Sequence, residues 1–165
     1  MRLALLLFTL VALAACDSVG TESDLGSFDA AFSGEHEERV EGIATYLWES
    51  SSTGPGLTLS MNVQEEGLGR RFTLADPEGL IASTSGSEFN LGDEASLSLR
   101  YADYRSGSET ELRAVTGTVT IDRVESDRIA GSFEATMGLV DEYQTAGGTR
   151  VEGSFKAVYV GYTSY

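Results

Sequence analysis

The sequence is short of the residues that most catalytic and metal sites need. It contains one cysteine, Cys16, and one histidine, His36. A lone cysteine excludes an internal disulfide, so the fold has to be held by its core. A zinc site needs more nitrogen and sulfur ligands than these two residues supply. His36 stands in a polar run, a poor place for the histidine of a Ser-His-Asp triad, and no G-x-S-x-G motif is present. We therefore expect a protein that is not an enzyme.

Basic residues are also scarce. The 165 residues include 11 lysines and arginines against 26 acidic residues, a formal net charge of −15, and Lys156 is the only lysine. Nucleic-acid binding requires clustered basic side chains that neutralise phosphates, so no nucleic-acid partner is expected. The same negative field would repel anionic headgroups. The acidity is typical of a highly soluble surface, including one adapted to salt, and cation binding is the alternative.

The N-terminal segment has the order of a secretory signal peptide. Arg2 precedes an apolar run over residues 3–13, and the small residues Ala14 and Ala15 follow. The run is too short for a transmembrane helix, which needs about 20 residues. We therefore expect residues 1–15 to be a cleavable export signal.

The tetrapeptide Leu13-Ala14-Ala15-Cys16 resembles the lipobox of bacterial lipoproteins. The resemblance implies cleavage before Cys16, a diacylglyceryl group on its sulfur and usually a further acyl chain on the new amine. Two or more chains anchor a protein stably. The implied partner is the membrane, and the implied location is the cell envelope, with the inner membrane, the outer membrane and the cell surface all open. Cleavage would leave ten basic against 26 acidic residues, a formal charge of −16.

Residues 16–34 have the composition of a tether. They are rich in Asp, Glu, Ser and Gly, which is typical of a flexible segment. Phe28 and Phe32 could dock its C-terminal end onto the fold. Residues 35–165 then form a single domain, long enough to bury a core without cross-links.

The domain shows the two-residue period of β-strands, and no useful stretch has helical periodicity. Turn residues separate the apolar-polar alternations, which predicts an all-β fold of about eight strands. Residues 115–123 and 128–137 flank a four-residue polar turn and should form an antiparallel hairpin. The clearest alternations cover residues 57–64, 95–102, 115–121 and 129–137; the predicted loops are 53–56, 65–69, 76–79, 106–108 and 138–148.

Three predicted strands carry a glycine in mid-strand, at Gly42, Gly131 and Gly153, each within an apolar-x-Gly-x-apolar order. A glycine there indicates a bend, a bulge or close packing, and therefore a strongly curved sheet. This favours an antiparallel β-barrel or β-sandwich, with a lipocalin-like barrel among the possibilities. Residues 117–122, 129–135 and 148–155 also resemble the C-terminal half of small β-rich bacterial lipoproteins of unknown function. That resemblance implies the same fold classes and no catalytic residues.

Two kinds of binding residue stand out. Asp122, Glu125 and Asp127 cluster around one predicted turn, and Asn90, Asp93 and Glu94 around another, where oxygen ligands could hold calcium. Neither set matches an EF-hand loop, so solvated turns are the favoured interpretation and calcium binding is the weaker alternative. Tyr46, Trp48 and Tyr101 could form a ligand-stacking platform if exposed, or belong to the core if buried.

The sequence leads to one main functional hypothesis and two alternatives. The main hypothesis is a membrane-anchored envelope lipoprotein whose non-catalytic β domain binds a partner, such as a protein or glycan, or has a structural role. The first alternative is a lipocalin-like carrier that holds a small apolar ligand inside a barrel. The second is a hydrolase that uses paired carboxylates, which would require one raised pKa. No cofactor is expected.

Overall fold

The computed structural model describes residues 25–34, 37–51, 54–64, 69–81, 85–92, 95–105, 110–139 and 148–164, without the side chains of 51, 54, 55 and 162–164. The signal segment, Cys16 and His36 lie outside these ranges, as do Asp93 and Glu94. Within them, no helix has the length and apolar character needed to cross a bilayer.

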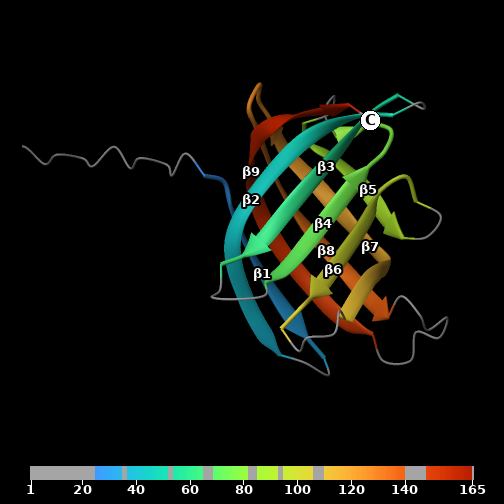
Figure 1. The fold of residues 1–165 in the computed structure, drawn as a ribbon. Coiled ribbons are helices and arrows are strands. Elements are labelled where there is room, and N and C mark those ends of the chain that lie inside the picture. Colours follow the sequence, from blue (N-terminus) through green and yellow to red (C-terminus); the bar gives the residue numbers. More distant parts are fainter. Residues whose placement is uncertain are drawn as a thin grey trace, which may run out of the picture.

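Eight of the described strands close into an antiparallel barrel (Figure 1). Each barrel strand pairs with its neighbours in sequence, and the last closes onto the first. The exception is β5, which is not one of the eight barrel strands. It pairs with residues 116–121 of β7 as an additional strand. The strands are β1 (Ser27–Ser33), β2 (Glu38–Ser51), β3 (Gly54–Val63), β4 (Arg70–Asp76), β5 (Ser87–Gly92), β6 (Ser98–Asp103), β7 (Thr110–Val124), β8 (Arg128–Leu139) and β9 (Thr149–Ser164).

The short strand β1 separates β2 from β9 over only part of the barrel wall. It lies between β2 and β9 along half of their length, and beyond its start β2 and β9 pair directly with each other in parallel. Gly26 occupies the point of separation. A Cβ at this position would lie 2.1 Å from the Ala44 carbonyl oxygen and 2.4 Å from that of Lys156. Only glycine therefore fits where the chain enters the wall.

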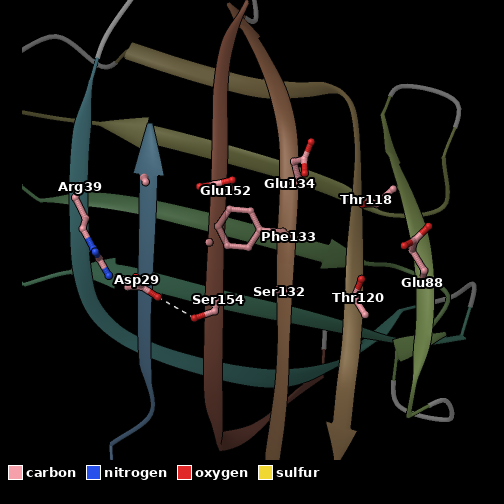
Figure 2. Close-up of a pocket in the computed structure, with 12 residues that line it drawn as sticks. Asp29, Arg39, Glu88, Thr118, Thr120, Ser132, Phe133, Glu134, Glu152 and Ser154 are labelled. Atoms are coloured by element: carbon pink, nitrogen blue, oxygen red, sulfur yellow. Dashed lines mark hydrogen bonds and ion pairs between the residues drawn. The ribbon is translucent and has the colours of Figure 1, made fainter. Parts of the chain in front are cut away.

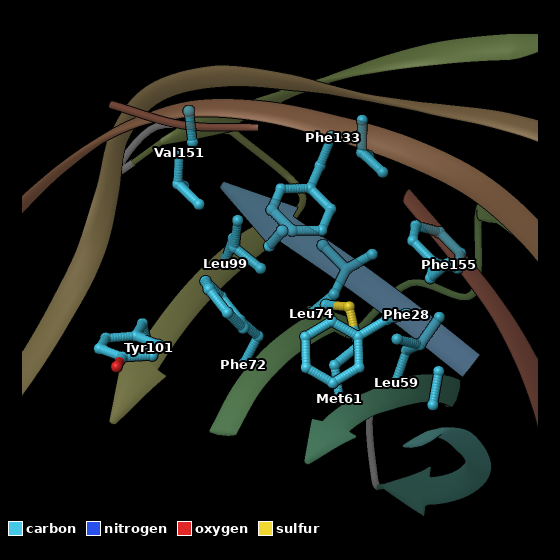
Figure 3. Close-up of a cluster of buried hydrophobic side chains, with 14 of the residues drawn as sticks. Phe28, Leu59, Met61, Phe72, Leu74, Leu99, Tyr101, Phe133, Val151 and Phe155 are labelled. Carbon is cyan, nitrogen blue, oxygen red and sulfur yellow. The ribbon is translucent and has the colours of Figure 1, made fainter. Parts of the chain in front are cut away.

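Aromatic rings fill the centre of the barrel (Figure 3). Phe72 on β4 is fully buried and contacts rings from three other strands. Its ring centroid lies 4.8 Å from Tyr101 and between 5.6 and 6.1 Å from Phe32, Phe133 and Phe28. Such distances are typical of favourable aromatic packing. The inward positions of the strands thus pack against one another at the barrel axis.

The mid-strand glycines explain how the sheet accommodates these rings. Each faces a phenylalanine across a strand pair: Gly42 faces Phe28, Gly131 faces Phe155 and Gly153 faces Phe133. A Cβ at any of the three would lie 2.6–2.9 Å from the facing ring. The missing side chain lets the ring lie against the backbone of the neighbouring strand, which is a device for curving a sheet.

The structure confirms the all-β prediction and, of the two architectures, is a barrel. The predicted antiparallel hairpin is also confirmed. It is formed by β7 and β8, which pair from Leu112 opposite Leu139 to Val124 opposite Ile129. Two boundaries were wrong. Residues 27–33 are strand rather than tether, because Phe28, Ala30 and Phe32 alternate into the core. Residues 54–56 are strand rather than loop, because their backbone pairs with the end of β2.

Candidate functional site

A polar groove of about 580 Å³ crosses the outer face of the wall that contains β5, β7, β8, β9, β1 and β2 (Figure 2). Its walls carry outward-facing carboxylates and hydroxyls, and Phe133 and Gly153 contribute to its floor. The polar side chains that line it are Asp29, Arg39, Glu88, Thr118, Thr120, Ser132, Glu134, Glu152 and Ser154.

Strand register arranges these side chains in rows across the wall. Neighbouring members of a row stand on neighbouring strands, about 4.8 Å apart. In the first row three hydroxyls lie between two carboxylates, and the second row contains two adjacent glutamates. The rows run Asp29, Ser154, Ser132, Thr120, Glu88 and Arg39, Ala31, Glu152, Glu134, Thr118.

Asp29 is held at one end of the hydroxyl row by two contacts. The Ser154 hydroxyl donates to its Oδ1 at 2.8 Å, and Arg39 donates to its Oδ2 at 2.6 Å. The Ser154 hydrogen bond, followed by the Arg39 guanidinium, lowers the pKa of Asp29 below its usual value. Asp29 is therefore ionised over the physiological pH range.

The adjacent glutamates of the second row are directly opposite each other. Glu134 on β8 faces Glu152 on β9, an arrangement in which like charges destabilise a sheet. Arg150 forms an ion pair with Glu134 and offsets part of this repulsion. The groove lining contains four carboxylates and one arginine, so it presents hydrogen-bond acceptors and negative charge. This chemistry suits ligands that offer ammonium or hydroxyl donors.

The predicted aromatic platform does not form in the structure. Tyr46 and Trp48 share the inner face of β2, where Tyr46 is buried 5.5 Å from the Tyr159 ring and Trp48 packs against the core. Tyr101 is buried in the central aromatic cluster, toward the other end of the barrel, where Arg70 lies. These three aromatics therefore do not form one exposed surface.

The predicted calcium ligands also stand apart. Glu125 forms an ion pair with Arg123 at 2.7 Å, whereas Asp127 lies toward Tyr46, whose pKa it helps to raise after the larger effect of burial. Asp122 is exposed on β7. The described part of the chain contains no group of three or more acidic or histidine side chains arranged to hold a metal ion.

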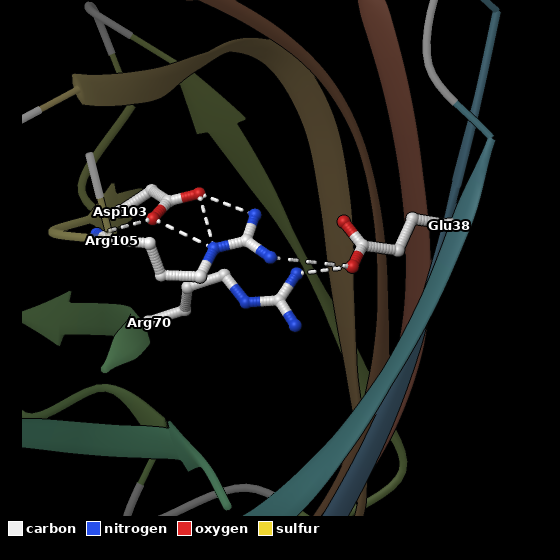
Figure 4. A network of polar contacts seen from close by, with 4 residues as sticks. All are labelled: Glu38, Arg70, Asp103 and Arg105. Atoms are coloured by element: carbon white, nitrogen blue, oxygen red, sulfur yellow. Dashed lines mark hydrogen bonds and ion pairs between the residues drawn. The ribbon is translucent and has the colours of Figure 1, made fainter. Parts of the chain in front are cut away.

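A second polar cluster closes the end of the barrel near Tyr101 (Figure 4). Arg70 is only 3% exposed, and its Nη1 donates to Glu38 Oε1 at 2.6 Å. Arg105 lies beside this pair and forms a two-pronged contact with Asp103, which lowers the pKa of that carboxyl. Burial raises the pKa of Tyr101, and a hydrogen bond with Arg70 opposes that effect. The cluster gives the buried Arg70 guanidinium a carboxylate partner, so we interpret its role as structural.

The groove residues were not singled out from the sequence. Ser132, Ser154, Thr118 and Thr120 occupy the polar positions of predicted strands, so their outward direction was predictable. Their convergence depends on which strands become neighbours. No family model matches the chain, and no match is found among curated proteins or solved structures. Functional inference therefore depends on the barrel, the groove and the N-terminal sequence.

Proposed function

We propose that this protein is a lipid-anchored lipoprotein of the cell envelope whose β-barrel has a non-catalytic binding or structural role. The observation that carries the proposal is the lipobox-like Leu13-Ala14-Ala15-Cys16 at the end of an apolar leader. The first barrel strand, β1, begins eleven residues later, at Ser27. Acyl chains at Cys16 would therefore hold a folded domain close to the membrane.

The proposed binding surface is the outer groove. The central rings around Phe72 occupy the barrel axis, which leaves the outer wall as the surface available to a partner. The groove presents hydroxyls and carboxylates. A polar partner that carries amines or hydroxyls, such as a glycan or a basic segment of a protein, fits this surface best.

The anchor is tested with the full chain expressed in a bacterium. An alkyne analogue of palmitate should label the native protein, and a membrane pellet should retain it. The Cys16→Ser variant should lose the label and shift to the soluble fraction. A native chain that takes up no label, or a Cys16→Ser chain that stays firmly in the membrane, would overturn the lipoprotein proposal.

A lipocalin-like carrier is the alternative that shares this architecture. A carrier needs an internal space, whereas the Phe72 cluster places aromatic rings 4.8–6.1 Å apart at the axis. Native mass spectrometry of the purified protein, together with titration of a fluorescent fatty acid, distinguishes the two functions. A co-purified apolar ligand or saturable one-to-one binding would favour the carrier.

A carboxylate-based hydrolase has the least support. Such an enzyme needs a general acid with a raised pKa. The pKa values of Asp29 and Asp103 are both shifted downward, by hydrogen bonds that favour the ionised form. These carboxylates are therefore poor proton donors near neutral pH.

A further inference from the structure

Exposed apolar side chains gather where the chain enters the barrel wall. Leu25 is 57% exposed, Val160 is 58% exposed and Tyr159 is 40% exposed. Gly26, the residue after Leu25, abuts the backbone of β9 at residues 156 and 158, so Leu25 lies beside the strand that carries the other two. Among the described residues, the only other exposed large apolar side chain is Leu139, toward the opposite end of the barrel.

Two basic residues adjoin these apolar side chains. Lys156 on β9 pairs with Ser27, and Arg128 on β8 pairs with Val158. Together with Arg123 they line a shallow pocket of about 110 Å³, with the small Ala130 between them. We refer to Leu25, Arg128, Lys156 and Val160 as the entry patch. Tyr159 is not part of it, because its ring packs 5.5 Å from that of Tyr46 on the inner face of the wall.

Acidic residues lie at the margin of the entry patch. Glu125 also lines the shallow pocket, but its carboxylate is ion-paired with Arg123. Asp122 stands on β7, on the side of β8 away from β9, and Asp127 lies toward Tyr46 at the barrel mouth. The patch itself thus contains two cations and two apolar side chains in a chain whose overall charge is strongly negative.

This combination matches the chemistry of a phospholipid surface. Apolar side chains insert at the boundary between headgroups and acyl chains, and long basic side chains reach the phosphates while their stems cover apolar area. Each basic side chain near an anionic leaflet contributes about 1 kcal/mol of attraction.

The length of chain before the barrel points to the same occupant. Leu25 follows Cys16 by nine positions in the sequence, a distance that a fully extended chain spans in about 30 Å at most. We infer that the entry patch is the surface through which the barrel rests on an anionic phospholipid leaflet. The inference rests on the proposed lipid anchor at Cys16.

The negative net charge does not prevent this contact. Charge interactions are screened over about 8 Å at physiological ionic strength, so the nearest side chains dominate what a headgroup experiences. The acidic groove lies on the same wall; it begins at the Asp29–Ser154 pair, the next outward row after Lys156, and extends toward the other end of the strands.

The contact can be tested on the full lipidated chain. Cys16 is the only native cysteine and would be blocked by its lipid, so Val160→Cys accepts a single environment-sensitive fluorophore. The matched control is Leu139→Cys. Both proteins are reconstituted in phosphatidylcholine vesicles with about 30 mol % phosphatidylglycerol, a lipid that supplies the anionic surface. We expect a blue-shifted emission that brominated lipids quench at position 160, and neither effect at position 139.

Charge variants test the role of the cations. Arg128→Glu with Lys156→Glu should reduce the blue shift at position 160, whereas Arg71→Glu, an exposed change on β4, should leave it unchanged. An unshifted label at position 160 in vesicles that still retain the protein by flotation would overturn the inference and spare the anchor. Loss of flotation in the unmodified chain would instead count against the anchor. A shift that depends on the protein-to-lipid ratio would overturn the inference in favour of contact between copies of the chain.

Discussion

The ring of Phe133 lies against the backbone of Gly153. The two residues are directly opposite on β8 and β9, and a Cβ on Gly153 would lie 2.6 Å from Phe133 Cζ. The next inward pair has the same partners in reverse, with Gly131 opposite Phe155. The repeated Gly-Ser-Phe order of the two strands thus encodes two reciprocal contacts, in which each glycine makes room for the ring of the other strand.

Gly153→Ala should destabilise the protein by about 1–3 kcal/mol, the usual cost of overpacking a well-filled core. The Phe133 ring could move, but the added Cβ would also lie 2.7 Å from the Asp29 carbonyl oxygen, which is backbone. Urea unfolding followed by Trp48 fluorescence measures the loss. Gly69→Ala is the control, because no atom lies within 4 Å of the Cβ it would add. Equal stability of the two variants would contradict the role assigned to Gly153.

Phe72→Ala should cost about 3–5 kcal/mol, the range for removing a buried aromatic ring. Phe72 is completely buried and contacts four other aromatic rings. Phe89→Ala on β5 removes the same atoms from a half-buried position at the margin of the core, so its loss should be clearly smaller. Thermal and urea unfolding of both variants provide the comparison. Similar losses would mean that the Phe72 cluster is not the centre of the core.

Glu38→Gln should destabilise the barrel by about 1.5–3 kcal/mol, the typical contribution of a hydrogen bond to a charged group. The substitution leaves the buried Arg70 guanidinium without its carboxylate partner. The matched control is Glu111→Gln, whose partner Arg100 is 63% exposed, and exposed ion pairs contribute at most about 1 kcal/mol. A smaller loss for Glu38→Gln than for Glu111→Gln in urea unfolding would refute the structural role of the Arg70 cluster.

Asp103 should make stability depend on acid pH. Hydrogen bonds from Arg105 hold the pKa of Asp103 below its ordinary value of 3.8, so ionisation favours the folded state. Its contribution is complete above that value and is lost as the pH falls through the folded pKa. We expect Asp103→Asn to flatten the fall in urea midpoint between about pH 5 and pH 3, the window set by that lowered pKa.

Arg105→Gln provides the matched test, because it removes the cause of the shift and keeps the carboxyl. It should flatten the same acid limb by a similar amount, and the double variant should add little. The effect will be modest, since both side chains are partly exposed. An acid limb that keeps its full slope in both single variants would show that this pair does not contribute to pH-dependent stability.

The strands were predictable because alternation is a local property. In a strand every second side chain points to the same face, so Ile129, Phe133, Ala135 and Met137 identified an inward face before any partner was known. The short polar turn of residues 124–127 is also a local feature, and it predicted the hairpin that β7 and β8 form. The mid-strand glycines also indicated curvature, since glycine in a strand needs a close neighbour or a bend to be useful.

Only the tertiary structure decided which distant strands became neighbours. Asp29 and Ser154 are 125 residues apart in sequence, yet their hydrogen bond completes one row of the groove. The groove, the entry patch and the Glu38–Arg70 pair all depend on closure of β9 onto β1 and on strand register. Period and turn chemistry are set by neighbouring residues, whereas closure and register are set by how all the inward side chains fill one shared interior, which no single segment specifies.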